Sequence, residues 1–217
     1  MKKLIYKELS LATLPLTFIF LLFSLMTFIP GYPILCGTFF ICLGIFQSWQ
    51  KAREDNDILY SVLLPIKKSD VVKGKYAAAV FIQLISFALC TAFTFIRMFF
   101  MADAAMYKTN FMMNANLVYL SFVLLIFAAF NIIFIGGFFK TAYRYGKPFV
   151  LFIIANFAII AIAETLHHLP GMKWLNNLNF DSAVCQLPLL VCAVVIYIIT
   201  TAVSCKKSKA LFEKLDL

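Results

Sequence analysis

The stretch LSLATLPLTFIFLLFSLMTFIPGYPILCGTFFICLGIFQSWQ, residues 9 to 50, contains no Asp, Glu, Lys or Arg. It is interrupted only by Ile29-Pro30-Gly31-Tyr32-Pro33, where two prolines and a glycine favour a tight turn. A transmembrane helix needs about 20 consecutive apolar residues, so the run is long enough for two spans and the turn between them. The sequence therefore predicts a membrane hairpin in this region.

The composition is that of a polytopic membrane protein. Hydrophobic residues make up 63% of the 217 residues and charged residues 13%, against roughly 25% charged in soluble domains. The uncharged stretches leave no room for a soluble domain, and the 25 phenylalanines suit a lipid-facing surface. The six cysteines show no metal-ligand spacing, and we expect no disulfide framework.

Uncharged stretches predict six spans in all. They lie at about 11–29, 33–50, 76–97, 114–138, 148–167 and 187–205. The expected fold class is an all-α membrane protein with six transmembrane helices that form a single transmembrane domain over residues 1–217. The first run is too long for a signal peptide and no small-residue cleavage site follows it, so we expect the first span to be retained.

Lys and Arg predict the orientation. With the N-terminus inside, the inner segments hold sixteen of the nineteen, and the outer segments hold only Arg97, Lys108 and Lys173. Cytoplasmic loops of membrane proteins carry such an excess. We therefore expect both termini to be cytoplasmic, and we attribute the net charge of +9 to contact with anionic membrane lipid rather than with nucleic acid.

Two polar segments carry apolar residues at helical spacing. Residues 1–11 predict a short amphipathic helix in the membrane interface, with a frayed basic tail as the alternative. Residues 51–76 read KAREDNDILYSVLLPIKKSDVVKGKY, in which acidic residues precede an apolar stripe that Pro65 ends. The stripe consists of Ile58, Leu59, Val62 and Leu63. A second helix, capped by Ser69-Asp70, is expected to run into the third span.

The apolar stripe of this loop has two interpretations. It is either an interfacial helix lying on the membrane or a coupling helix that inserts into a groove of a soluble motor. The pattern alone favours neither.

The loop also carries a recognisable motif. It reads Asp55-x-Asp57-x-x-Tyr60-Ser61-x-Leu63-Leu64-Pro65-Ile66-Lys67-Lys68-x-x-x-Val72-x-x-Lys75-Tyr76, directly after the predicted hairpin. In this the chain resembles the small ABC-2 type permeases of Gram-positive bacteria, in which a motif near Ser-Leu-Pro-Ile-x-Arg-x-x-Ile-Val-x-x-Lys-Tyr follows the second span. The resemblance is most specific over about 51–80, and the six spans, the interfacial helix and the long external loop extend it loosely over the whole chain. This chain departs from the pattern at Val62-Leu63-Leu64-Pro65, where the apolar character is kept.

The resemblance implies an ABC-2 type exporter fold and a partnership. Members are the membrane halves of exporters that pair with a separate ATPase, so it implies two copies of an ABC ATPase subunit and a second permease, identical or related, in the bacterial plasma membrane. ATP and magnesium would be bound by the ATPase, and no cofactor by this chain. Some members export amphipathic peptides, bacteriocins or toxins, which implies an amphipathic or hydrophobic cargo. The residues that would meet the ATPase are Asp57, Tyr60, Leu63, Leu64 and Pro65.

The sequence also shows no motif with which this chain could bind ATP. A phosphate-binding loop needs an upstream glycine and a Ser or Thr after its Lys. Gly74-Lys75 is followed by Tyr and Gly146-Lys147 by Pro, and neither has the upstream glycine. We therefore expect the chain not to be an enzyme and ATP hydrolysis to be carried by a partner.

Polar residues inside predicted spans are functional candidates by default. The candidates for a translocation path are Gln83, Asn131, Asn156 and Glu164. For the three amides the alternative is hydrogen bonding between helices.

Two other functions stay open. An intramembrane enzyme would use Glu164, His167 and His168, but this Glu-x-x-His-His pattern lacks the leading His of the zinc-protease form, and we expect no metal site. A non-transporting sensor or immunity protein would sequester a peptide without ATP. An ATPase gene beside this one would distinguish these functions from the exporter.

Overall fold

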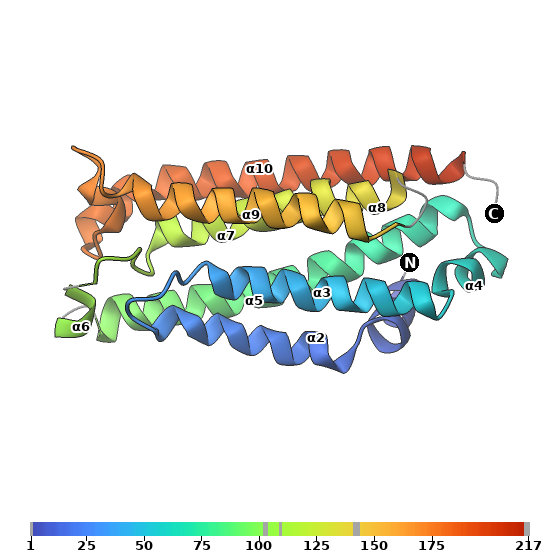
Figure 1. Ribbon diagram of the computed structural model, residues 1–217, viewed down its shortest axis with the longest axis horizontal. Helices are drawn as coiled ribbons and strands as arrows, with labels where there is room; N and C mark the ends of the chain where they lie inside the picture. Colours follow the sequence, from blue (N-terminus) through green and yellow to red (C-terminus); the bar gives the residue numbers. More distant parts are fainter. Residues whose placement is uncertain (1, 102–103, 109, 141–143, 215–217) are drawn as a thin grey trace.

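A computed structural model describes residues 2–101, 104–108, 110–140 and 144–214. Every regular element within these residues is a helix, and the long helices run roughly along one axis (Figure 1). The prediction of an all-α protein is confirmed for this part of the chain.

The N-terminal segment is helical but sharply bent. α1 (Lys2–Lys7) continues into the π-helix η1 (Glu8–Ala12), and the pair meets α2 (Pro15–Phe20) and the 3₁₀ helix η2 (Leu21–Phe28) at 91°. Leu14 lies at the bend in an extended conformation, which the following proline favours. Its N–H donates to Ser48 Oγ over 2.8 Å, so the bend is fixed to the next helix.

The predicted hairpin and loop are observed. Gly31 adopts a positive φ of 70° in the turn before α3 (Cys36–Glu54), and Asn56, with φ 55°, separates α3 from α4 (Asp57–Leu63). α4 ends where Leu64 becomes extended before Pro65. α5 (Lys68–Phe100) then runs without interruption into the third predicted span. The predicted cap is wrong, because α5 begins at Lys68 and Lys67 occupies its N-cap without a side-chain bond.

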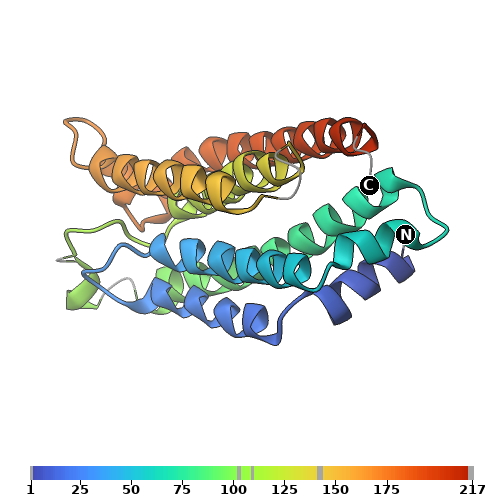
Figure 2. The same cartoon turned by 45° about the vertical axis from the view of Figure 1, so that its right-hand side comes forward.

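The C-terminal half forms a second layer. It comprises α7 (Leu117–Ala129), the π-helix η3 (Phe130–Ile135), α8 (Gly136–Lys140), α9 (Gly146–Leu166), the 3₁₀ helix η4 (Lys173–Asn176) and α10 (Phe180–Glu213). The short helix α6 (Ala105–Lys108) lies instead beside the end of α5, where Tyr107 Oη donates to the Phe28 carbonyl over 2.9 Å. In both views α7, α8, α9 and α10 lie on one side and α2, α3 and α5 on the other (Figures 1 and 2).

Four helical segments of the described chain are long and apolar enough to cross a membrane, or five if the bent pair Lys2–Ala12 and Pro15–Phe28 counts as one span. The four are Lys68–Phe100, Leu117–Lys140, Gly146–Leu166 and Ser182–Glu213, and they coincide with the third to sixth predicted spans. The first two predicted spans fall short by this measure. α2 with η2 is short, and the last part of α3 carries Gln47, Gln50 and three charged residues. The protein is therefore a multi-pass membrane protein, with four or five candidate spans of this kind in the described residues.

Aromatic rings form much of the core between the layers. Phe130, Phe134, Phe138, Phe139 and Phe152 are buried and contact one another and their neighbours. The ring of Trp49 on α3 lies 4.9 Å from that of Phe138, centroid to centroid. The expectation that the phenylalanines suit a lipid-facing surface therefore holds only in part, because many of them pack inside.

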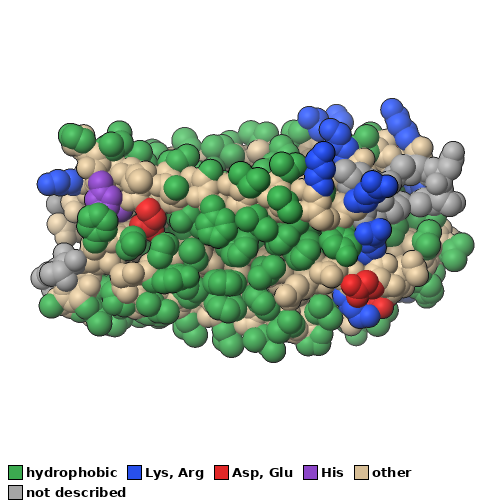
Figure 3. Space-filling view, viewed as in Figure 1, with side chains coloured by type: hydrophobic (Ala, Val, Ile, Leu, Met, Phe, Trp, Pro, Cys, Tyr) green, Lys and Arg blue, Asp and Glu red, His purple; other side chains and the backbone are tan. Residues whose placement is uncertain are grey.

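The two ends of the molecule differ in charge. Figure 3 shows hydrophobic side chains along the middle of one face, with Lys and Arg gathered mainly at the end near the termini. At the opposite end Arg97 is fully buried. Its Nη1 donates to the Thr27 carbonyl over 2.6 Å and its Nη2 to Asn114 Oδ1 over 2.9 Å. The loops assigned to the inside by charge thus lie at the same end of the molecule.

Candidate functional site

α4 carries an exposed apolar surface at the basic end of the molecule. Leu63 is 85% exposed and Tyr60 58%, and Leu59 and Ile66 are also exposed. We call these four residues the apolar tip. On the other face of α4, Ile58 and Ser61 are buried. Large apolar side chains in a charged loop are costly to leave in water, so the tip is a candidate contact surface.

The residues predicted to meet an ATPase fall into two groups. Tyr60 and Leu63 belong to the apolar tip, Pro65 is exposed beside it, and Leu64 is half-buried. Asp57 instead faces inward, where two ammonium groups bind its carboxylate. The structure therefore brings four of the five residues to or near one surface and assigns Asp57 to a different set of contacts.

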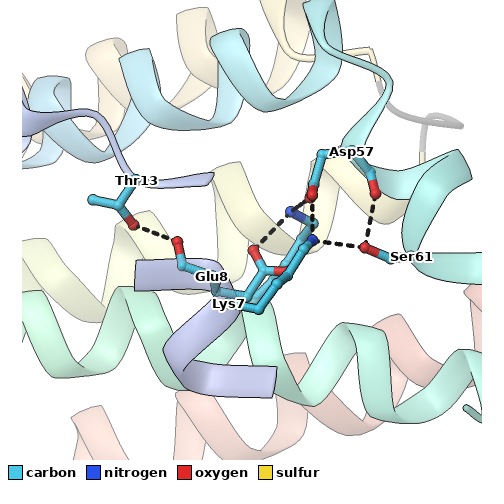
Figure 4. A network of polar contacts seen from close by, with 6 residues as sticks. Lys7, Glu8, Thr13, Asp57 and Ser61 are labelled. Atoms are coloured by element: carbon cyan, nitrogen blue, oxygen red, sulfur yellow. Dashed lines mark hydrogen bonds and ion pairs between the residues drawn. The ribbon is translucent and has the colours of Figure 1, made fainter. Parts of the chain in front are cut away.

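Asp57 belongs to a network of four charged side chains. We call Lys7, Glu8, Asp57 and Lys75 the charge cluster (Figure 4). Lys75 Nζ lies 3.0 Å from Glu8 Oε2 and 2.8 Å from Asp57 Oδ2. Lys7 pairs with Glu8 at 3.1 Å and with Asp57. Lys7 Nζ also donates to Ser61 Oγ over 2.7 Å. Two acids and two bases give the cluster no net charge.

Two of the charged side chains in the cluster are almost completely buried. The side chains of Glu8 and Lys75 are 3% and 5% exposed, so neither group can turn to water. Burial alone would raise the pKa of Asp57, but the ammonium groups of Lys75 and Lys7 outweigh it and hold this pKa below its usual range. The Asp57 carboxylate is therefore charged at neutral pH and paired with both ammonium groups.

Close packing holds the N-terminal helix at the cluster. A Cβ added at Gly74 would lie 2.9 Å from Leu4 Cγ, so α1 approaches α5 where α5 has no side chain. On the other side, Lys75 Nζ lies 5.7 Å from the centre of the Trp49 ring of α3. Gly74 thus allows α1 to approach α5 closely, and the ion pairs of Lys75 then join the same two segments.

A hollow separates the N-terminal helix from the apolar tip. Its volume is about 240 Å³, and Leu11, Ala12, Ala52, Asp55, Asp57 and Tyr60 line it. It is therefore continuous with the tip through Tyr60 and with the charge cluster through Asp57. A partner that covered the tip would reach this hollow as well.

Two of the predicted path residues bind each other. Gln83 Nε2 donates to Asn131 Oδ1 over 2.9 Å, and Asn131 Nδ2 donates to Gln83 Oε1 over 3.1 Å. Two residues of α10 complete the set. Asn131 Nδ2 donates to Thr201 Oγ1 over 2.9 Å, and Tyr197 Oη donates to Gln83 Oε1 over 2.8 Å. We call these four residues the amide network. It joins α5, η3 and α10, and hydrogen bonding between helices accounts for both amides.

The amide network extends toward the basic end. Ser204 Oγ donates to the Asn131 carbonyl over 2.8 Å and lies 2.8 Å from Tyr76 Oη, which also lies 2.9 Å from Ser208 Oγ. Tyr76 follows Lys75 on α5. Polar contacts therefore run from the middle of the bundle to the residue next to the charge cluster.

The other two path candidates lie apart from this network. Asn156 on α9 is fully buried, and neither its Oδ1 nor its Nδ2 has a hydrogen-bond partner among the described residues. Glu164, near the opposite end of α9, accepts from the Met113 N–H over 2.8 Å at Oε2, while its Oε1 has no partner in the same residues. The four candidates therefore do not form one lining.

The histidine pair contacts the segment before α7. His167 Nε2 lies 3.2 Å from the Phe111 carbonyl, and the His168 ring stacks on that of Phe111 at 4.3 Å. Within the part of the chain that the structure describes, no group of three or more His, Cys, Asp or Glu side chains could hold a metal ion. The pair and Glu164 instead fix the end of α9 to the segment before α7.

In a comparison with known protein families, residues 3–213 match the family described as ABC-2 family transporter protein. The chain belongs to this ABC-2 transporter family. The resemblance noted in residues 51–80 is thus confirmed over nearly the whole chain. Membership implies a transporter membrane subunit that works with an ATPase. Comparisons with curated proteins and with solved structures gave no match.

The charge cluster of this ABC-2 family protein was not predicted. Lys75 was noted in the motif and in the test for a phosphate-binding loop, and Glu8 was given no partner. A signal was present, since Glu8 stands at the start of a long uncharged run and Lys75 between apolar residues, where an unpaired charge is costly. The two residues are 67 positions apart in the sequence, and no local pattern reveals their pairing.

Proposed function

We propose that this chain is the membrane-spanning permease subunit of an ABC exporter, driven by a separate ATPase that docks on the apolar tip. The permease pairs with an identical or related permease and with two ATPase subunits, and ATP and magnesium bind to the ATPase. It lies in the bacterial plasma membrane with both termini in the cytoplasm. The single observation that carries the proposal is the exposure of the apolar tip at the basic end of a family member.

The tip fits a helix-in-groove contact. Leu59, Tyr60 and Leu63 of the tip share one face of α4, and Ile66 follows just beyond its end. The opposite face of α4 is fixed to the protein by Ile58 and by the ion pairs of Asp57. A rigid helix that presents only its apolar face can enter a groove without first ordering a loop. This arrangement favours a motor contact over a helix lying loosely on the lipid.

Helix lengths support six crossings, as an ABC-2 exporter fold requires. A 3₁₀ helix rises about 2.0 Å per residue against 1.5 Å in an α-helix, so α2 with η2 extends about 25 Å. The uncharged part of α3, residues 36–50, extends about 22 Å by the same measure. Both lengths are shorter than the hydrocarbon thickness of about 30 Å, and the local thinning of the bilayer that such a mismatch calls for has a modest cost.

The cargo is amphipathic or hydrophobic, and it passes between the two permeases. Of the four path candidates, Asn156 is the strongest, because its buried amide keeps its full hydrogen-bonding capacity. Glu164 keeps one free oxygen. Gln83 and Asn131 would have to exchange their mutual bonds to meet a cargo, so we assign them a weaker role.

The test is recovery of an ATPase with tagged permease solubilised from its own host in mild detergent. The tagged protein carries either the wild-type tip or Leu63→Asp, and the readout is vanadate-sensitive ATP hydrolysis in the eluate. A contact that buries Leu63 loses it on introduction of a charge, so we expect hydrolysis with the wild type and a loss of tenfold or more in the variant.

Leu169→Asp is the matched control, because Leu169 is an exposed leucine in a loop at the opposite end. It should recover as much hydrolysis as the wild type. Absence of hydrolysis with the wild-type tip would overturn the exporter. Peptide binding without any ATP dependence would then favour the sensor or immunity protein. Equal recovery with Leu63→Asp would leave the ATPase in place but remove the tip as its docking surface.

A further inference from the structure

The charge cluster joins three segments that are far apart in the sequence. Lys7 and Glu8 come from α1 and η1, Asp57 from α4, and Lys75 from α5. Lys7 links the N-terminal helix directly to α4 through Asp57 and Ser61. Lys75 is the only one of the four that lies on a long membrane-spanning helix. It therefore connects both peripheral pieces to the membrane bundle.

Lys75 is placed to hold two acids at once. Its Nζ lies 3.0 Å from Glu8 Oε2 and 2.8 Å from Asp57 Oδ2, and these two oxygens belong to different elements. Its side chain is 5% exposed, so the ammonium group has no water to replace either acid. Removing it would leave two buried carboxylates with Lys7 as their only described counter-charge.

We propose that Lys75 is a positioning residue that holds the N-terminal helix and α4 against α5, so that the three move as one unit when α4 is displaced. The source of that displacement is the ATPase of the proposed function, on which this part of the inference rests. The N-terminal helix is then a member of the transmission and not only a membrane anchor. Its bend of 91° turns such a movement toward the first span.

The physical basis is the asymmetry between making and breaking a buried ion pair. A buried pair adds little net stability, because removing the charges from water is costly. Losing one partner is expensive, since the other charge is then stranded in a poorly solvated site. Separating α4 or the N-terminal helix from α5 would strand charges in the same way, so the cluster resists separation.

Amide hydrogen exchange of the permease alone, in lipid nanodiscs, tests the first half of the proposal. Lys75→Met keeps an unbranched side chain, one atom shorter, and removes its charge. We expect residues 2–12 and 57–63 both to exchange about tenfold faster or more, since each loses its contact with α5. An increase confined to the start of α5 would overturn the proposal.

Lys73→Met is the matched control. Lys73 lies two residues away on α5 and, among the described residues, pairs with Asp70 at 2.6 Å in a partly exposed position. Surface pairs contribute little, so this change should leave exchange in both segments within about twofold of the wild type. If the two lysine variants behave alike, the proposal fails.

Asp57→Asn tests the contacts of α4 separately from those of the N-terminal helix. It remains informative if Lys75→Met does not fold. It keeps the shape of the side chain and retains the Lys75–Glu8 pair. Exchange should rise in residues 57–63, while residues 2–12 keep at least half of their protection. Equal loss in both segments would show a general loosening of this end and would contradict the role assigned to Lys75.

The second half needs the complex recovered through the apolar tip. In the wild type, ATP, magnesium and vanadate should change exchange in residues 57–63 and 2–12 together. In Lys75→Met the ATPase should still be recovered, because the tip is intact, but the change should be confined to residues 57–63. A change in both segments of the variant would overturn the transmission role. Failure to recover any ATPase with the wild type would overturn the proposed function and leave the permease-only result to decide the positioning role.

Discussion

Replacing Asn131 by leucine tests whether the amide network holds the two layers together. The Asn131 side chain takes part in three hydrogen bonds, two with Gln83 and one with Thr201. Leucine has nearly the same shape, so the change removes the bonds with little change of volume. The variant then measures polar contacts between α5, η3 and α10 rather than packing.

The magnitude follows from these contacts. Hydrogen bonds between membrane helices contribute about 0.6 kcal/mol on average, so the loss of three costs about 2 kcal/mol. Gln83 Nε2 is also left buried without an acceptor, which costs about 1–3 kcal/mol more. We expect Asn131→Leu to lower the free energy of unfolding by about 3–5 kcal/mol, against about 0.6 kcal/mol for Thr201→Val, which removes one bond.

The assay is reversible unfolding in bicelles, followed by steric trapping. The double variant Gln83→Leu, Asn131→Leu strands no amide of the pair and loses their two mutual bonds only once. It should therefore cost about 2–4 kcal/mol less than the sum of the two single variants. Additive single costs would refute the reasoning, because they would show that the two amides do not depend on each other. A cost for Asn131→Leu below about 0.6 kcal/mol, the value of one such bond, would refute it as well.

Three further predictions concern the cluster and the orientation. Because the ammonium groups lower the pKa of Asp57 in the folded state, the stability that its ion pairs contribute is complete at neutral pH and is lost as pH falls through that lowered pKa; the unfolding free energy measured between pH 7 and pH 3 should fall less steeply in Asp57→Asn. Gly74→Val should cost about 1–3 kcal/mol by overpacking against α1, and adding Leu4→Ala should recover part of this in the same unfolding assay. A membrane-impermeant maleimide added to intact cells should label Cys185, which is exposed at the end assigned to the outside, and not Cys205 near the basic end; the reverse pattern would invert the orientation.

Local patterns in the sequence predicted the helices well. Pro65 disfavours a helical conformation at the preceding residue, and this predicted the end of α4. Runs without charged residues predicted the last four spans. Both signals act over a few residues, because they depend on backbone conformation and on contact with lipid. The first hairpin was less well predicted, since an uncharged run does not show that η2 is a 3₁₀ helix or that α3 ends in polar residues.

Long-range pairing was the part that the sequence could not supply. Gln83 and Asn131 were identified as polar residues inside spans, but only the fold shows that they bond to each other and to α10. The same holds for Glu8 and Lys75. Asp57 was assigned to a partner because it belongs to the motif, whereas its carboxylate faces the protein. The contact of Tyr60, Leu63, Leu64 and Pro65 with an ATPase stays a prediction.

The π-helical turn η3 has a consequence for how this chain tolerates insertions and deletions. A π-turn holds one residue more than an α-turn, so α8 is rotated relative to where an unbroken α7 would place it. Deleting one residue within η3 would restore regular winding and turn everything after it by about 100°. Phe138 and Phe139 would then leave Trp49 and face lipid. The direction in which the aromatic side chains of α8 face therefore depends on a single extra residue in η3. Substitutions in η3 should be tolerated far better than changes in its length.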